Sequence, residues 1–198
     1  MPYTMAVITD PYYDKPKWIS NDVTRKEYMC LSSESSSHDV ELFLTHLFGY
    51  MNINVEHTLL ISFNELFEQD YIALSGGVAF FADEHNYILP SCCCGLEDYS
   101  NVIDSIINKQ SPWMGHDPSP GLTYNNNQVY VWPDDPESSN SSEKSIDFSY
   151  EELKVNLDKT SKEIKGFIEG PLYYWIAKEN SEIAVAMKEK MKKWLLNE

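Results

Sequence analysis

The chain has 198 residues and a net charge of −16, and 42% of its residues are hydrophobic. This length fits one domain with a substantial core, and 13 Tyr, 8 Phe and 5 Trp argue against disorder. An acidic field repels nucleic-acid backbones and anionic membranes, so binding to DNA, RNA or membranes is disfavoured. A basic protein partner would be attracted, although solubility alone accounts for an acidic composition equally well.

The excess of acidic residues is confined to the first three quarters of the chain. Residues 1–148 contain 6 Lys or Arg and 22 Asp or Glu, whereas residues 149–198 contain nine of each. We therefore predict an acidic core over 1–148 and C-terminal helices over 149–198, packed together in a single domain. The N-terminus shows no basic segment followed by an apolar run, so we expect a cytoplasmic protein whose four cysteines are reduced thiols.

One clear helix and several short β-like runs are predicted in the N-terminal half. Residues 5–9 are predicted to form a strand. A helix is predicted from residue 39, because apolar residues recur at helical spacing: Val40, Phe43, Leu44, Leu47, Phe48 and Met51. Apolar runs predict an antiparallel meander over residues 58–63, 71–74, 78–82 and 87–89, with turns at Gly76-Gly77 and 83–86. A single helical turn over 64–69 is the alternative within this region.

A second helix is predicted after Gly95. Its apolar side consists of Leu96, Tyr99, Ile103, Ile106 and Ile107. Residues 111–120 must form a loop because three prolines interrupt them. A strand is predicted at 129–132 after the turn-forming residues 125–127, and the polar segment 134–145 is predicted to be a linker or exposed loop.

The C-terminal segment is predicted to be helical. Ser149 and Glu152 form a capping box, and Gly170-Pro171 is expected to end this helix and start a short one. A last helix should begin at Asn180 or Ser181 and bury one stripe of residues: Ile183, Met187, Met191 and Leu195. The predicted fold class is α+β, with a small, mostly antiparallel sheet, helices before, within and after it, and a C-terminal helical segment.

Three adjacent cysteines, Cys92, Cys93 and Cys94, precede the second predicted helix. If this segment is extended, Cys92 and Cys94 lie on one side, and His116 with Asp117 could complete four metal ligands. Zinc is disfavoured, because structural zinc sites usually carry a second Cys pair and none is present. We therefore predict neither a bound metal nor a cofactor.

A nucleophilic cysteine is the other chemical interpretation of this triplet. Cys94 stands just before a helix, which favours a thiolate, but Glu97 and Asp98 in the first turn raise the thiol pKa. His116 or His85 could act as base only if the fold brings one of them close. The chain has no phosphate-binding glycine loop, serine-hydrolase motif or helical zinc-protease motif. We predict no catalytic residue and favour small, buried cysteines at a strand-to-helix junction.

The loop after the second helix completes this motif. His116-Asp117 resembles an orienting histidine–carboxylate pair, but its place between Gly115 and Pro118 favours a turn held by the Asp117 side chain. Trp113 is expected to pin the loop to the core. The predicted structural motif comprises Cys92, Cys93, Cys94, Gly95, Trp113, Gly115, His116 and Asp117.

Acidic turns beside aromatic residues suit a protein-binding surface. Carboxylates next to aromatic rings are what a binder of a basic surface would present. Ordinary solvated turns are the alternative, because loops are normally polar. The predicted partner-binding residues are Asp83, Glu84, Tyr130, Trp132, Asp134 and Asp135.

Two resemblances accompany these patterns. The stretch C-C-C-G-L-E-D-Y followed by W-M-G-H-D-P-S-P-G resembles an uncharacterised bacterial family with a C-C-C-G-L-E-D-W…P-W-x-G-H-D-P-S-P block, over about residues 78–135. Tyr99 stands where a tryptophan is more usual in that block. Size, acidity and α+β layout also resemble immunity proteins of bacterial polymorphic-toxin and contact-dependent inhibition systems.

The second resemblance implies a non-enzymatic protein that binds and neutralises a cognate toxin domain. Nuclease toxins suit the charge, because their active-site surfaces are basic. Two alternatives stay open at this point. One is a small cysteine- or zinc-dependent enzyme that uses the Cys92–Cys94 and His116 region, and the other is an acidic scaffold or housekeeping protein.

Overall fold

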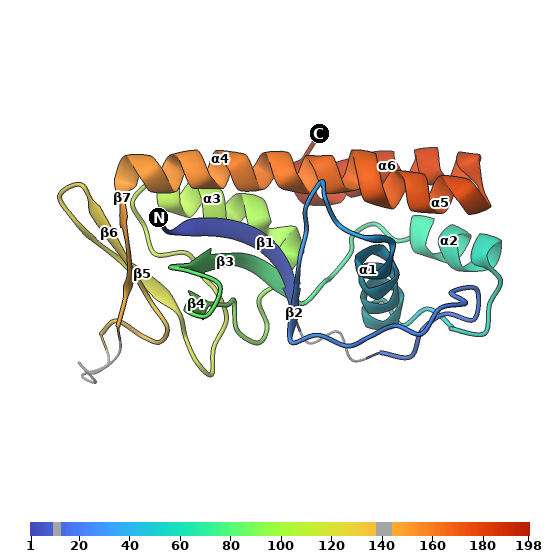
Figure 1. Ribbon diagram of the computed structural model, residues 1–198, viewed down its shortest axis with the longest axis horizontal. Helices are drawn as coiled ribbons and strands as arrows, with labels where there is room; N and C mark the ends of the chain where they lie inside the picture. The colour runs from blue at the N-terminus through green and yellow to red at the C-terminus, as the bar shows by residue number, and fades with distance from the viewer. Residues whose placement is uncertain (10–12, 138–143) are drawn as a thin grey trace. The chain divides into compact units, whose positions relative to one another are not determined.

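The computed structural model describes residues 1–9, 13–137 and 144–198 (Figure 1). Their contacts define two compact units, and each is described by itself. The first unit contains residues 1–7 and 75–162, and the second contains residues 8–74 and 163–198. Helices and two small sheets make up the chain, which confirms the predicted α+β class.

The first sheet has the strand order β2-β1-β3-β4. Its strands are β1 (Tyr3–Thr9), β2 (Tyr28–Cys30), β3 (Gly76–Phe81) and β4 (Tyr87–Ile88). Every residue of β3 is buried, and β4 pairs with it antiparallel. The ring of Tyr3 stacks on Phe81 with 4.8 Å between centroids. The predicted strands at 5–9, 78–82 and 87–89 are therefore confirmed.

The second sheet is an antiparallel meander of three strands in the first unit. Its strands are β5 (Gly121–Asn125), β6 (Gln128–Trp132) and β7 (Ile146–Ser149), in that order. Alternate residues of β6 and β7 are buried, including Val129, Val131 and Phe148, so only one face of this sheet packs on the core. The sequence predicted β6 alone, because β5 and β7 are short and half polar.

Helices of the first unit are anchored by buried hydroxyl groups. These helices are the 3₁₀ turn η1 (Leu96–Asp98), α3 (Tyr99–Ile107) and the first part of α4 (Tyr150–Phe167). Thr160 of α4 lies 2.7 Å from Thr4 of β1, hydroxyl to hydroxyl, and also donates to the Thr4 carbonyl at 2.9 Å. The predicted capping box of α4 is confirmed, since Ser149 and Glu152 bond reciprocally.

The second unit is mainly helical. It contains α1 (Ser37–Tyr50), α2 (Leu59–Phe67), the end of α4, the π-helical turn η2 (Ile168–Leu172), α5 (Tyr173–Glu179) and α6 (Ser181–Leu196). Phe43 and Phe167 meet edge to face in its core, with 5.0 Å between centroids. A buried carboxylate, Glu41, accepts hydrogen bonds from Asn21 at 2.7 Å and from the Trp175 indole at 3.3 Å. Asn180 caps α6, as predicted.

Two predictions for the meander region are wrong. The predicted strand at 58–63 is instead the N-cap, Thr58, and the start of helix α2, in which burial follows helical spacing at Ser62, Phe63 and Leu66. Residues 71–74 form no strand, and Gly76-Gly77 begins β3 instead of making a turn. A Cβ on Gly77 would lie 3.3 Å from the Cys94 sulfur, so glycine here permits close approach of the two segments.

Gly170-Pro171 does not end the helix, contrary to expectation. The backbone stays helical from α4 through η2 into α5, and both residues that flank η2 have right-handed helical angles. Pro171 lacks a backbone N–H to donate, and the π-type turn accommodates this within a continuous helix.

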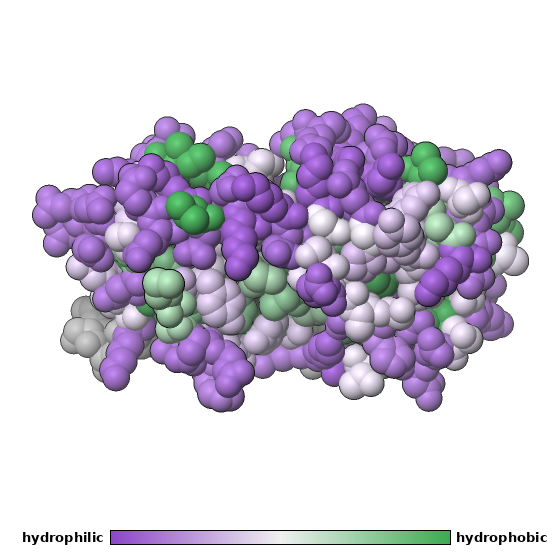
Figure 2. Space-filling view, turned by 45° about the horizontal axis from the view of Figure 1, so that its top comes forward, coloured by the Kyte–Doolittle hydropathy of each residue, from purple (hydrophilic) through white to green (hydrophobic). Residues whose placement is uncertain are grey.

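Figure 2 shows one face of the molecule, on which hydrophilic, intermediate and hydrophobic residues all occur. Hydrophilic side chains dominate it, and hydrophobic ones form small separate patches. Within the described parts of the chain, no helix combines the length and apolar character needed to span a membrane. Part of the predicted linker at 134–145, namely residues 138–143, lies outside the described residues.

Candidate functional site

Backbone bonds join the cysteine segment to the loop before β5. Cys92 and His116 form an isolated antiparallel bridge, and the His116 N–H donates to the Cys92 carbonyl at 3.3 Å. The Ser91 N–H donates to the Met114 carbonyl at 2.7 Å, and the Ser91 hydroxyl donates to the His116 carbonyl at 2.7 Å. The two halves of the cysteine–histidine block, 24 residues apart, thus form one local structure.

Three potential metal-binding or reactive groups meet at this bridge. The sulfur of Cys92 lies 2.7 Å from Nδ1 of His116. One ligand atom each from Cys92, Cys93 and His116 falls within 4.8 Å of the others, and all three residues are exposed. We call these three residues the Cys–His cluster. A carboxylate oxygen of Asp117 lies 3.9 Å from the same His116 nitrogen.

The cysteines that share this cluster are not the ones predicted. Extended backbone would place Cys92 and Cys94 on one side, but Cys93 adopts a left-handed conformation with φ of 65°. This interrupts the alternation of a strand and leaves Cys92 and Cys93 together. The expectation that all three cysteines are buried is wrong for Cys92 and Cys93, and it holds for Cys94 alone.

The environments of the thiols differ accordingly. Burial raises the pKa of Cys94 to about 12, and the Asp98 and Glu97 carboxylates add to this increase. The prediction that Glu97 and Asp98 raise the pKa of Cys94 is therefore confirmed. The neighbouring Cys92 sulfur raises the pKa of the exposed Cys93 thiol. Burial raises the pKa of Cys30 to about 11.

The loop around His116 is held mainly by residues other than those predicted. Trp113 is 58% exposed and does not pin the loop to the core, whereas the neighbouring Met114 is buried. Gly115 has a φ of 98°, and a Cβ there would lie 2.6 Å from the Cys92 carbonyl oxygen. Only glycine therefore fits at this crossing. The Asp117 side chain is 95% exposed beside His116.

A second candidate surface is the solvent-facing side of the three-stranded sheet. Tyr130 lies directly opposite Thr123 of β5 and Asp147 of β7, so the three side chains share one face. The Trp132 ring lies 6.5 Å from Tyr130, and its indole donates to the Thr123 hydroxyl at 2.9 Å. We call Thr123, Tyr130, Trp132 and Asp147 the outer face. Asp147 was not singled out in the sequence, because β7 was not predicted.

A cavity of about 320 Å³ borders the outer face. Thr123 contributes to both features, and the exposed Trp113 forms part of the cavity wall. Asp135 and Glu137 also line it, and they follow directly after β6 in the chain. This cavity therefore offers one aromatic ring and two carboxylates, which suits a cationic side chain of a partner.

The predicted partner-binding acids do not all have the same role. Asp134 accepts hydrogen bonds from the Ser119 and Asp135 backbone N–H groups, both at 2.8 Å, and these bonds lower the pKa of its carboxyl. Its carboxylate thus holds the loop. Asp83 and Glu84 stand in the turn between β3 and β4, where Asp83 accepts from the His85 N–H. They belong to the other sheet.

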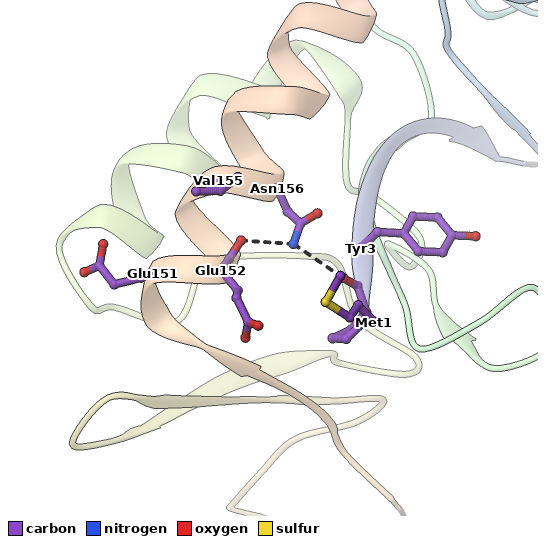
Figure 3. Close-up of a pocket in the computed structure, with 7 residues that line it drawn as sticks. Met1, Tyr3, Glu151, Glu152, Val155 and Asn156 are labelled. Atoms are coloured by element: carbon purple, nitrogen blue, oxygen red, sulfur yellow. Dashed lines mark hydrogen bonds between the residues drawn. The ribbon is translucent and has the colours of Figure 1, made fainter.

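An open cleft of about 460 Å³ lies beside the start of β1, between its first residues and α4 (Figure 3). Val155, 70% exposed, and Met1 line it together with Glu151 and Glu152. Asn156 spans its inner end by donating to the Glu152 carbonyl at 3.0 Å and to the Pro2 carbonyl at 3.4 Å. These lining groups suggest no chemistry beyond packing.

Compared with family models, with curated proteins and with solved structures, the chain matches none.

Proposed function

We propose that the chain is a non-enzymatic binding protein of the immunity type, which neutralises a cognate bacterial toxin domain, such as a nuclease, in the cytoplasm. The observation that carries this proposal is the outer face with its adjoining cavity. Tyr130, Trp132 and Asp135, three of the six residues predicted from sequence, lie on or beside it, and Trp113 adds an exposed ring. Aromatic anchors surrounded by carboxylates favour a basic partner surface.

Charge supports the same surface. Residues 75–148 include the β3–β4 turn, the connections of the second sheet and the cavity, and they contain 11 Asp or Glu but only 2 Lys or Arg. An uncompensated field of this kind accelerates association with a basic protein and disfavours acidic competitors. The enzymatic alternative has the Cys–His cluster, which the proposed function does not use.

Growth rescue in cells that express a toxin domain tests the proposal. The domains to be tested are any toxin domains that the genes next to the gene for this chain encode. Co-expression should restore growth, and purified chain should bind the domain with an affinity that weakens as salt concentration rises. Reversing the charge of Asp135 and Asp147 to Lys should weaken binding by at least about tenfold. A chain that neither rescues growth nor binds this domain would refute the proposal.

Two matched double variants locate the surface. Glu68 and Asp70 are exposed acids of the second unit, and reversing both to Lys makes the same change in net charge. This control should bind as the parent does. Reversing Asp83 and Glu84 tests the other predicted acids. If either of these two variants weakens binding as much as the Asp135/Asp147 pair, the outer face is not the docking surface.

A further inference from the structure

The Cys–His cluster has a composition that the proposed function leaves unused. Two thiols and one imidazole, from Cys92, Cys93 and His116, converge on the surface of the first unit within 4.8 Å. Thiolate sulfur and imidazole nitrogen are the ligands that zinc and other thiophilic cations prefer in proteins.

We propose that Cys92, Cys93 and His116 bind a single thiophilic divalent cation, with zinc as the physiological ion. His116 contributes Nδ1, the nitrogen that already faces Cys92. Asp117 is the protein group placed to provide a fourth ligand, because its carboxylate lies 3.9 Å from that nitrogen. Water fills the position otherwise, as it does in three-ligand zinc sites.

The dimensions of the cluster agree with this coordination. Tetrahedral zinc places its sulfur and nitrogen ligands roughly 3.6 Å apart and two sulfurs roughly 3.8 Å apart. The cluster spans at most 4.8 Å, and the sulfur–nitrogen contact of 2.7 Å must widen by roughly 1 Å when the ion enters. All three residues are exposed, so their side chains have room to rotate as this distance widens.

Two backbone features hold the ligands in place. The left-handed conformation of Cys93 turns its sulfur toward Cys92, at a position where glycine would be less strained. Gly115 lets the loop approach the Cys92 carbonyl closely enough for His116 to reach the thiols. The residue types and the backbone geometry therefore both favour a metal site with two thiol ligands over a tight turn without a ligand.

Binding is balanced by proton release. Zinc replaces the thiol protons of Cys92 and Cys93, so two protons leave for each ion bound, and the neutral imidazole loses none. Cys94 takes no part, since it is buried against Gly77. The local excess of acidic residues further attracts a cation to this surface.

Cobalt(II) titration of the reduced, full-length protein tests the site, followed by displacement with zinc. We expect one Co²⁺ per chain, visible absorption bands of tetrahedral geometry, and a near-ultraviolet band from thiolate-to-cobalt charge transfer. Removing a residue that only hydrogen-bonds to a metal ligand already weakens the affinity for the metal by about 10–100-fold. Cys92→Ser and Cys93→Ser should therefore each weaken binding by at least about 100-fold and reduce the charge-transfer band by half.

Cys30→Ser is the matched control, because it removes a thiol of the second unit and should leave the titration unchanged. Far-UV circular dichroism of each variant separates loss of ligand from loss of fold. Absence of the bands, or unchanged affinity in both cluster variants, overturns the proposal. So does metal-free native protein that is two hydrogen atoms lighter, if peptide mapping places the disulfide between Cys92 and Cys93. The assay involves no toxin domain, so its outcome is independent of the proposed function.

Discussion

The buried hydroxyl pair between β1 and α4 allows a quantitative test of the first unit. Thr4 is 3% exposed and Thr160 is fully buried, and their hydroxyls lie 2.7 Å apart. Thr160→Val keeps the shape of the side chain but leaves the Thr4 hydroxyl without this partner. A buried polar group that loses its partner costs about 1–3 kcal/mol, and we expect this reduction in the free energy of unfolding.

The double variant Thr4→Val/Thr160→Val separates the hydrogen bond from packing. When both partners become apolar, no hydroxyl stays unsatisfied, so the double variant should be more stable than the sum of the single changes predicts. We expect a coupling free energy of about 1 kcal/mol or more. Urea unfolding followed by circular dichroism measures all three variants. Thr24→Val, at an exposed position, should change stability by less than about 0.5 kcal/mol.

Additivity would refute this reasoning. If the two single costs sum to the cost of the double variant within about 0.3 kcal/mol, the hydroxyls do not interact in the folded protein. A change in the denaturant slope of one variant would point instead to altered unfolding behaviour.

Four further predictions concern the buried groups and the loop. Glu41→Ala should lower the free energy of unfolding, measured in urea, by about 2–3 kcal/mol, because the Trp175 indole loses its hydrogen-bond acceptor. Glu41→Gln keeps an acceptor and should lower it by less than half as much. Equal decreases for the two variants would contradict the hydrogen-bonding role of Glu41. A thiol reagent at pH 8 should modify two of the four cysteines quickly in native reduced protein, those of the Cys–His cluster, and all four after denaturation. Four fast thiols in the native state would contradict the partial burial of Cys30 and the full burial of Cys94. Folding raises the pKa of Cys30 from 9.0 to about 11 and that of Cys94 from 9.0 to about 12. The protonated thiols therefore contribute their full stability to the folded state below pH 9, and this contribution is lost as the pH rises to 12. Urea unfolding between pH 8 and 11 should show the free energy of unfolding decline, and Cys94→Ala should make this decline less steep. Gly115→Ala should cost at least about 1–2 kcal/mol in the same assay, because its φ of 98° and the close Cys92 carbonyl both exclude a side chain, and unchanged stability would contradict that geometry.

Local sequence patterns predicted the features that depend on neighbouring residues. The Asn180 cap of α6 and the Ser149–Glu152 box join groups that lie within three residues of each other. The apolar spacing of α1 predicted the helix, but burial extends to all of its sides over residues 40–48. The strands β5 and β7 were missed because pairing with β6, and not their own composition, makes them strands.

In the candidate sites, too, local patterns were predictable and contacts between distant segments were not. Sequence identified Cys92 and His116 as members of one motif, but their contact depends on a bridge across 24 residues and on the backbone conformation of Cys93. Neither property has a local signal, since cysteine rarely adopts positive φ. The predicted pair of Cys92 and Cys94 followed from the alternation of an ideal strand, which this segment does not keep. Tyr130 and Trp132 were predicted to bind a partner because acidic residues follow them. They share one side of β6 because this strand alternates between buried and more exposed residues.

The division of the chain between its units has a consequence for biosynthesis. Each unit consists of two separate stretches, and both β1 and α4 begin in the first unit and end in the second. The hydrogen bond between the Thr4 and Thr160 hydroxyls therefore cannot form until Thr160, 156 residues later in the chain, has been synthesised. Neither unit is complete on a chain that ends before α4, so a ribosome that stalls there leaves two incomplete cores whose apolar residues are exposed to chaperones and proteases.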